Sequence, residues 1–257
     1  MTYVQLDVGQ GDAAVFHLPR GKTVLVDGGP VSTTFNAGER IIAPYLHHRG
    51  IRTLDAVILT HAHSDHVGGL AAVLESFQVH KVILSDSSSH SPIFKNFLDV
   101  ARKRRIPTQM ITAPDSLVLE GVIFYLISPD SLMAQDDNPN NQSVVTLICH
   151  GKDRILLTGD AEVEAETHMI HTIHPLHTDL MKVGHHGSYT ASSEAFIQNV
   201  KPKAVIISVG EKNRFGHPSA EILKRYETHG VQVLRTDHEG AVIYQSDGRG
   251  FLRVEWQ

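Results

Sequence analysis

The sequence has almost no cysteine. Its single cysteine, Cys149, excludes an internal disulfide and lies in the apolar stretch VVTLICH, where we expect a small core residue on a buried strand. The absence of disulfides fits a reducing compartment.

Long hydrophobic runs are also missing. No stretch approaches the roughly 20 apolar residues of a membrane-spanning helix, and no signal-peptide core opens the chain. We therefore expect no membrane span in this chain.

The chain lacks an excess of positive charge. Its 23 Lys and Arg against 28 Asp and Glu give a net charge of −5, so bulk electrostatics do not attract a polyanion. Any binding of nucleic acid would need a local basic patch or bound metal ions.

The 257 residues are 41% hydrophobic and 20% charged, as in a soluble globular protein with a large core. We find no linker-like shift in composition and no internal repeat, so we predict a single domain, 1–257. Strand patterns dominate the start of the chain, and helices alternate with strands in the rest. Two sheets with helices outside fit this order better than one parallel sheet.

Eighteen histidines are present, and three of them fall within LTHAHSDHVGGL (59–70). The run LDAVILT (54–60) predicts a buried strand, and 66–77 predicts a helix. His61, His63, Asp65 and His66 would stand in the loop between them. Such a mixed set of nitrogen and oxygen ligands suits Zn, Mn or Fe, and four groups in one short loop suit two ions better than one.

Two further strands end on residues of the same kind. Asp160 follows RILLTG, and His185 and His186 follow DLMKVG. Taken singly, Asp160 has a competing interpretation as a helix cap, and the histidine pair as part of a polar loop. Three strand ends that each carry metal-type ligands indicate a shared metal site.

These motifs identify a resemblance. The HxHxDH pattern, the later TGD and the histidine after a strand resemble the metallo-β-lactamase fold superfamily. More narrowly, LDVGQGDA, NNQSVV, LMKVGHHGS and the final SVGEKNRFGHPSAEIL resemble the hydrolase domain of ComEC-type DNA-internalisation proteins, over about residues 4–245. The resemblance implies an α/β (α+β) fold, the four-layer αββα sandwich, with the site at one edge of the sheets.

Ligand roles follow from the resemblance. His61 and His63 would bind one ion, Asp65 and His66 the second, with Asp160 bridging. We expect His185 rather than His186 to complete the second site, because it follows the strand directly. Asp27 would brace the metal loop.

One departure concerns the first ion. Many members of the superfamily have a third histidine where this chain has Asn140 and Asn141. Asn141 is therefore a possible ligand through its carbonyl oxygen. We expect two divalent ions, Mn or Zn, with Mn favoured.

Catalysis would be attack on phosphorus by a hydroxide that two metals activate. Asp65 would orient the water. His186 or His217 would face the substrate and donate a proton to its leaving oxygen or hold a phosphate. Ser188 and Lys182 are candidates for phosphate contacts. Competing interpretations are a turn cap for Ser188, a solvated strand residue for Lys182 and a packed residue for His217. GQGD (9–12) is best interpreted as a hairpin turn.

The leading functional hypothesis is a nuclease that degrades the non-imported strand during natural transformation. Its substrate would be single-stranded DNA, and its partner the membrane channel of a competence protein. An excised domain of this kind would work at the extracellular face of the cell membrane. The alternatives are a hydrolase of small phosphodiesters or other esters on the same fold, and a DNA-guiding module that keeps metal only for structure.

Overall fold

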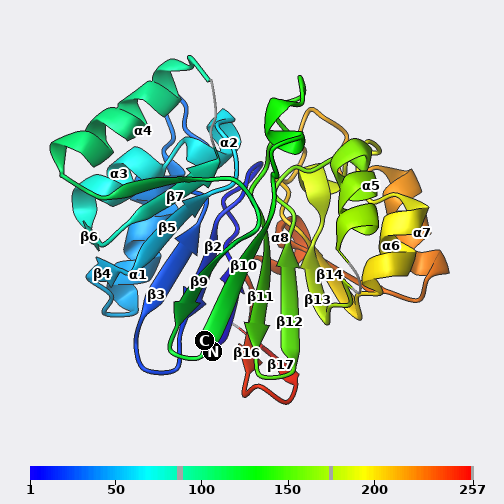
Figure 1. Ribbon diagram of the computed structural model, residues 1–257. Coiled ribbons are helices and arrows are strands. Elements are labelled where there is room, and N and C mark those ends of the chain that lie inside the picture. The colour runs from blue at the N-terminus through cyan, green and yellow to red at the C-terminus, as the bar shows by residue number, and fades with distance from the viewer. Residues whose placement is uncertain (86–88, 174–175, 256–257) are drawn as a thin grey trace.

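Two β-sheets lie face to face in the computed structural model, which describes residues 1–85, 89–173 and 176–255 (Figure 1). Helices cover the outer face of each sheet. This arrangement confirms the predicted four-layer αββα sandwich.

The first sheet has eight strands in the order β17-β16-β1-β2-β3-β5-β7-β8. Its strands are β1 (Thr2–Gln5), β2 (Ala14–His17), β3 (Thr23–Val26), β5 (Ala56–Leu59), β7 (Val82–Ser85), β8 (Thr108–Ile111), β16 (Val242–Ser246) and β17 (Phe251–Val254). Strands β3, β5, β7 and β8 are mutually parallel, and the others pair antiparallel.

The second sheet has seven strands in the order β15-β14-β13-β12-β11-β10-β9. Its strands are β9 (Asp115–Leu119), β10 (Val122–Ser128), β11 (Val145–His150), β12 (Asp153–Leu157), β13 (Leu180–Lys182), β14 (Ala204–Ile207) and β15 (Gln232–Arg235). Strands β12 to β15 are parallel. A small third pair joins β4 (Thr53–Leu54) to β6 (Gln78–Val79).

Helices form the outer layers. The first half of the chain supplies η1 (Gly38–Ile42), α1 (Ala43–His48), α2 (Ser64–Val67), α3 (Leu70–Ser76) and α4 (Pro92–Lys103); the second half supplies η2 (Met133–Gln135), α5 (Val163–Thr172), η3 (Gly184–Gly187), α6 (Glu194–Val200), α7 (Ala220–Thr228) and α8 (Thr236–Glu239). Within the described ranges, no helix is both long and apolar enough to span a membrane.

The core lies in three layers of buried apolar side chains. The middle layer joins the two sheets: Phe16 of β2 meets Phe124 of β10 edge-on at 5.4 Å between ring centroids. The other two layers lie between each sheet and its helices. Since each sheet is covered on both faces, its central parallel strands are almost wholly apolar, as in AVIL of β5 and AVII of β14.

The parallel strands determine where loops meet. The carboxyl ends of parallel strands lie at one edge of a sheet, and in α/β proteins this edge carries the ligand sites. Here the loops after β3 and β5 face those after β12 and β13. The sheets therefore bring Asp27, His61, Asp160 and His186 to a common edge.

The predicted helix over 66–77 is two helices, α2 and α3, separated by Gly68 and Gly69. The interruption has a steric cause. A Cβ on Gly69 would lie 2.3 Å from the carbonyl oxygen of Gly28 and 2.3 Å from the amide nitrogen of Gly38. Three backbone segments thus touch just behind the histidine loop, and only glycine allows that contact.

We expect Gly69→Ala to lower the free energy of unfolding by about 1–3 kcal/mol, the usual cost of overpacking. Gly69 has an ordinary helical φ of −82°, so the effect would be steric rather than conformational. The measurement is urea-induced unfolding. Gly250→Ala is the matched control, because nothing lies within 4 Å of its added Cβ. Equal midpoints for the two variants would show that the three segments are not in tight contact.

Candidate metal centre

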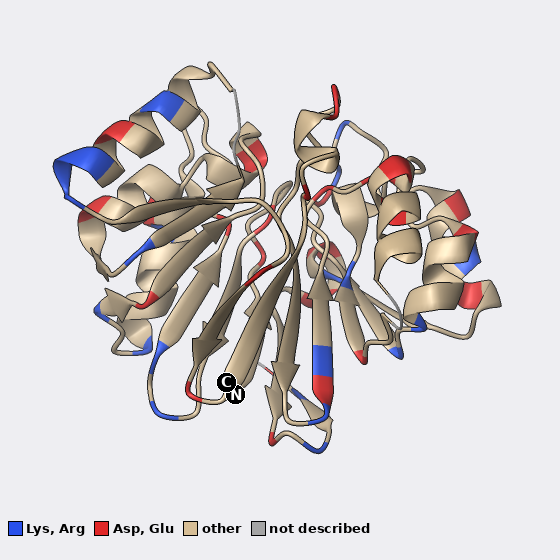
Figure 2. Ribbon diagram, in the orientation of Figure 1, with Lys and Arg blue, Asp and Glu red and all other residues tan. Residues whose placement is uncertain are grey.

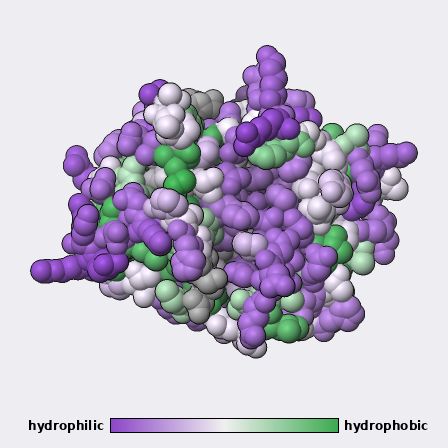
Figure 3. Space-filling model, turned by 90° about the horizontal axis from the view of Figure 1, so that it is seen from above, coloured by the Kyte–Doolittle hydropathy of each residue, from purple (hydrophilic) through white to green (hydrophobic). Residues whose placement is uncertain are grey.

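Five chain segments meet at the edge where the parallel strands end. They are the β1–β2 loop with Asp12, the residue after β3, the loop after β5, the residue Asp160 after β12, and η3 after β13. Acidic segments, red in Figure 2, gather along this edge between the two halves of the molecule. Seen from above, the middle of the same edge is hydrophilic (Figure 3).

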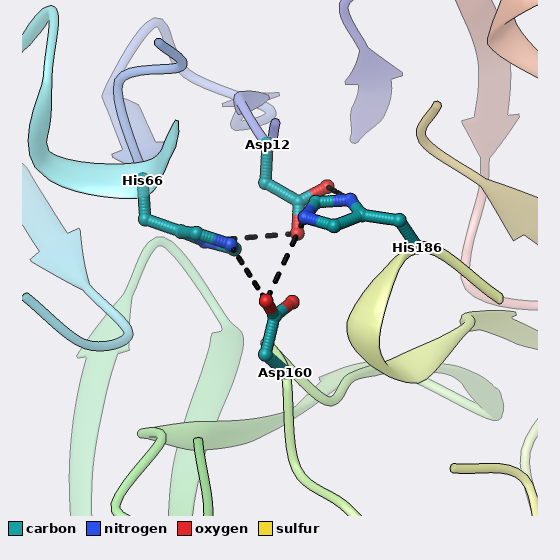
Figure 4. A group of neighbouring side chains, drawn as sticks. All are labelled: Asp12, His66, Asp160 and His186. Carbon is teal, nitrogen blue, oxygen red and sulfur yellow. Dashed lines mark ion pairs between the residues drawn. The ribbon is translucent and has the colours of Figure 1, made fainter. Parts of the chain in front are cut away.

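Four side chains at this edge form a compact buried cluster: Asp12, His66, Asp160 and His186 (Figure 4). One nitrogen or oxygen atom of each lies within 4.8 Å of the corresponding atom of every other. Such a set, with two imidazoles and two carboxylates, has the composition of a divalent transition-metal site.

Asp160 lies at the centre of the histidines. Its Oδ2 is 3.2 Å from His66 Nε2, 3.6 Å from His186 Nε2 and 3.8 Å from His61 Nε2. Asp160 thus faces imidazoles from both sheets, as a carboxylate shared between two ions would.

Unsatisfied buried atoms support the fit to a metal. Among the described residues, His61 Nε2, His66 Nε2, His186 Nε2, Asp160 Oδ1 and Asp12 Oδ1 are buried without a hydrogen-bond partner. Leaving one such atom unpaired costs about 1–3 kcal/mol, so a group of five needs a reason. A cation bound among them would satisfy nitrogen lone pairs and carboxylate oxygens together.

The remaining nitrogens of two histidines are fixed by hydrogen bonds. His66 Nδ1 lies 2.8 Å from Asp27 Oδ2, and His186 Nδ1 lies 2.8 Å from the carbonyl oxygen of Ser208. In each case Nδ1–H donates, so Nε2 is the ring nitrogen that faces the cluster. Metal-binding histidines in proteins are typically oriented in this way.

Asp27 also holds the histidine loop. Its Oδ1 accepts from the Thr60 amide at 2.8 Å, and its Oδ2 accepts from the Thr60 hydroxyl at 2.8 Å. The structure therefore places Asp27 behind the loop, in contact with His66, where the sequence predicts a bracing residue.

The buried histidines differ in the direction in which their surroundings shift their pKa. Burial disfavours the charged form of His66, but Asp160 and Asp27 outweigh burial and raise its pKa well above the usual value. The same balance, with Asp160 and Asp12, raises the pKa of His186. Burial and the neighbouring His66 lower the pKa of His61 well below its usual value.

Lys182, predicted to contact phosphate, lies beneath the cluster. Its side chain is 3% exposed, and its ammonium pairs closely with Asp12 Oδ2, lies 3.5 Å from Asp160 Oδ1 and donates to the Gly159 carbonyl at 2.8 Å. Burial opposes the charge, but Asp12 and Asp160 outweigh it and raise the pKa of Lys182. The structure thus directs this ammonium at protein carboxylates, away from solvent.

The two histidines of η3 point to different places. Both have left-handed backbone conformations, with φ of 47° at His185 and 51° at His186. His186 joins the cluster, 3.3 Å from Asp65 Oδ2. His185 Nδ1 instead lies 2.8 Å from Glu162 Oε1, outside the cluster. The placement is the reverse of our expectation, because the left-handed turn directs the second histidine inward.

The other predicted ligands lie around the cluster. The rings of His61 and His63 are 4.6 Å apart, with His61 buried and His63 exposed. Asp65 is partly exposed at the opening, and its pKa is lowered because His186 and His66 outweigh its burial. Asn141 uses its carbonyl oxygen to accept from the Glu162 amide at 3.0 Å, so that oxygen already has a donor.

The remaining candidates are Ser188 and His217. Ser188 is buried and bonds the hydroxyl of Thr190 at 2.9 Å, as a residue that stabilises a turn would. The ring of His217 lies 5.5 Å from that of His185, at the rim of the site. Burial and the neighbouring His185 lower the pKa of His217 to about 4, so it is neutral at pH 7.

Sequence reasoning missed Asp12. The stretch GQGD predicts a turn, and the turn exists, but its last residue points into the cluster. The sequence did hold a signal, because Asp12 lies at the start of an apolar strand. Asp160 lies at the end of one, and that position was used to predict it.

Comparison with known proteins agrees with this geometry. The family model described as "Metallo-beta-lactamase superfamily" matches residues 6–211. The chain is 33% identical over 256 residues to ComE operon protein 3 of Bacillus subtilis (strain 168), covering 95% of this chain and 33% of that protein. It is 30% identical over 250 residues to competence protein ComA of Neisseria gonorrhoeae, covering 97% and 33%. The chain thus spans about a third of the length of these relatives.

Among solved structures, CmlA, a diiron beta-hydroxylase from Streptomyces venezuelae, superimposes with a TM-score of 0.62 at 14% identity over 98% of this chain and 54% of that one. This likeness shows the shared fold. The family match over most of the chain shows that the chain belongs to the metallo-β-lactamase superfamily. With its buried His/Asp cluster, it is a metal hydrolase of that fold, related to competence proteins.

Proposed function

We propose that this domain is a metal-dependent nuclease that hydrolyses phosphodiester bonds in DNA. The observation that carries the proposal is the group of five unsatisfied buried atoms around Asp160, which calls for cations at the edge of the sheets. Relatives named as competence proteins support DNA as the substrate class.

The residues divide into two ligand sets. His66, His186 and Asp65 would hold one divalent ion, His61 and His63 the other, and Asp160 lies within reach of both. Nitrogen and oxygen ligands without sulfur suit Mn²⁺ or Zn²⁺. Bound there, such ions supply a hydroxide nucleophile at neutral pH and offset the charge of the phosphate.

The chain's own side chains orient the reactants. Asp65 is ionised and partly exposed, so it can accept a hydrogen bond from the attacking water. His185 and Glu162 form a histidine–carboxylate pair at the rim, which suits transfer of a proton to the leaving oxygen. We therefore assign His186 to the metal and His185 to the substrate.

We propose that the domain acts beside a DNA-uptake channel, at the extracellular face of the cell membrane, on the strand that is not imported. Two observations support this setting: the relatives are named as competence proteins, and they are about three times as long as this chain, which leaves room for further domains. Single-stranded DNA would then be its substrate.

A second candidate is the hydrolysis of a small phosphodiester. Carboxylates lie at one side of the opening: Glu162 accepts from Asn140 at 2.8 Å, and Glu164 lies 3.5 Å from Asn141 Nδ2. These acidic groups disfavour a long polyanion on that side and would accept a compact substrate.

The test is a cleavage assay on chelator-treated protein. We expect no activity without metal, recovery with Mn²⁺ or Zn²⁺, and faster cleavage of single-stranded DNA than of a small chromogenic phosphodiester. Asp160→Asn should remove both activities, since it removes the carboxylate that faces both ion positions. Faster turnover of the small ester would favour the second candidate, and cleavage in the presence of excess chelator would contradict both.

Replacing each histidine of η3 separately tests their assignment. His186→Ala should weaken Mn²⁺ binding by more than the roughly 10–100-fold that loss of a residue orienting a ligand costs. His185→Ala should keep Mn²⁺ binding and lower kcat. Equilibrium dialysis and steady-state kinetics measure the two effects. Normal metal affinity in His186→Ala, or its loss in His185→Ala, would reverse the assignment.

Metal binding should depend on pH. Because the pKa of metal-free His66 is raised, this imidazole is protonated at neutral pH, and a metal must displace its proton. Affinity should therefore rise with pH from 5 to 8, by roughly tenfold per pH unit for each proton released. Calorimetry in two buffers of different ionisation enthalpy counts the protons. An affinity that stays constant over this range would show that His66 carries no proton to displace.

A further inference from the structure

An exposed aromatic side chain lies on the loop that borders the metal centre. Phe215, between β14 and α7, is 55% exposed. A single exposed apolar side chain is common on protein surfaces, so what matters here is what surrounds it. Tyr189, which follows the HHGS segment directly, is 69% exposed.

A row of rings connects Phe215 to the cluster. The Phe215 ring stacks on His217 at 5.8 Å between centroids and 30° between planes. His217 lies 5.5 Å from His185, and His185 lies 6.4 Å from His186. Three ring-to-ring steps of 5.5–6.4 Å thus separate Phe215 from His186, so a strand of a few nucleotides bound at the cluster can reach Phe215.

The loop that carries Phe215 is held in place. Asn213 Oδ1 accepts from the amides of Phe215 and His217, both at 3.1 Å, and its Nδ2 donates to the His217 carbonyl at 2.6 Å. The Ser219 amide donates to the Gly187 carbonyl at 2.9 Å, which ties the loop to η3. Phe215 is thus presented on a fixed support next to the histidines.

Positive charge accompanies the ring. The exposed Arg214 guanidinium lies over the Phe215 ring, with its carbon 5.1 Å from the ring centroid. Lys212, two residues earlier, is also exposed, and its ammonium lies 3.3 Å from Glu211 Oε1. An aromatic face beside an exposed cation matches a base beside its phosphate.

We propose that Phe215 is a stacking platform for an unpaired nucleobase of the bound strand, with Arg214 contacting a neighbouring phosphate. The ligand is therefore single-stranded nucleic acid, because bases inside a duplex have both faces covered by their stacked neighbours. The inference rests on the proposed function and specifies its substrate class.

The test measures binding to fluorescein-labelled (dT)15 by anisotropy, with chelator present so that no cleavage occurs. Base–aromatic stacking contributes about 1–3 kcal/mol per base. We expect Phe215→Ala to weaken binding by about 10-fold, which corresponds to about 1.4 kcal/mol. Phe215→Trp should retain wild-type affinity.

Two controls separate stacking from other effects. Leu252→Ala removes a comparably exposed apolar side chain, 66% exposed on β17, the edge strand of the first sheet, and should leave (dT)15 binding unchanged. An abasic oligomer of equal length should bind wild type and Phe215→Ala alike. Unchanged (dT)15 binding in Phe215→Ala, or an equal loss for the abasic oligomer, would overturn the proposal.

Failure of the nuclease proposal gives a different result. Mn²⁺ affinity should be unaffected in Phe215→Ala, because Phe215 provides no ligand atom. If wild type binds (dT)15 through Phe215 but cleaves no DNA with any metal, the stacking proposal is supported and the nuclease proposal is wrong. If wild type cleaves DNA and Phe215→Ala binds (dT)15 normally, the nuclease proposal is supported and the stacking proposal is wrong.

Discussion

The ion pair between Lys182 and Asp12 makes the metal-free centre possible. Asp12, Asp27 and Asp160 are all buried at one edge of the sheets, and buried carboxylates need compensation. In the described part of the chain, Lys182 is the one lysine or arginine that is buried, and its ammonium faces Asp12 and Asp160. This fixed positive charge offsets part of the carboxylate charge before any metal binds. The ammonium lies 3.5 Å from Asp160 Oδ1, and the histidines face Oδ2.

Two consecutive residues with left-handed backbone conformations, His185 and His186, point to different parts of the centre. The turn at His185 and His186 directs adjacent side chains to opposite sides, one to the cluster and one to Glu162. Neighbouring residues thus face different groups without competing for one place. The loop of Phe215 packs on the same turn: a Cβ on Gly187 would lie 2.6 Å from Pro218 Cβ. The turn of His185 and His186 and the loop that carries Phe215 are therefore in direct contact.

Much of this was predictable, because strand patterns and motif chemistry are local. LDAVILT predicts β5, the apolar runs before Asp160 and His185 predict β12 and β13, and parallel strands bring their ends together. The break between α2 and α3 was not predictable, because it depends on contact with Gly28 and Gly38, distant in sequence. The inward position of Lys182 depends in the same way on Asp12, 170 residues earlier. The choice between His185 and His186 depends on backbone handedness, which residue types do not specify.

The absence of sulfur from the centre has a chemical consequence. The ligands of the proposed function are imidazoles and carboxylates, and the single cysteine, Cys149, is half-buried on β11 with a thiol whose pKa burial raises. Peroxide attacks thiolates, and a thiol that stays protonated reacts slowly. Oxidants that release zinc from cysteine-bound centres would thus find no target here.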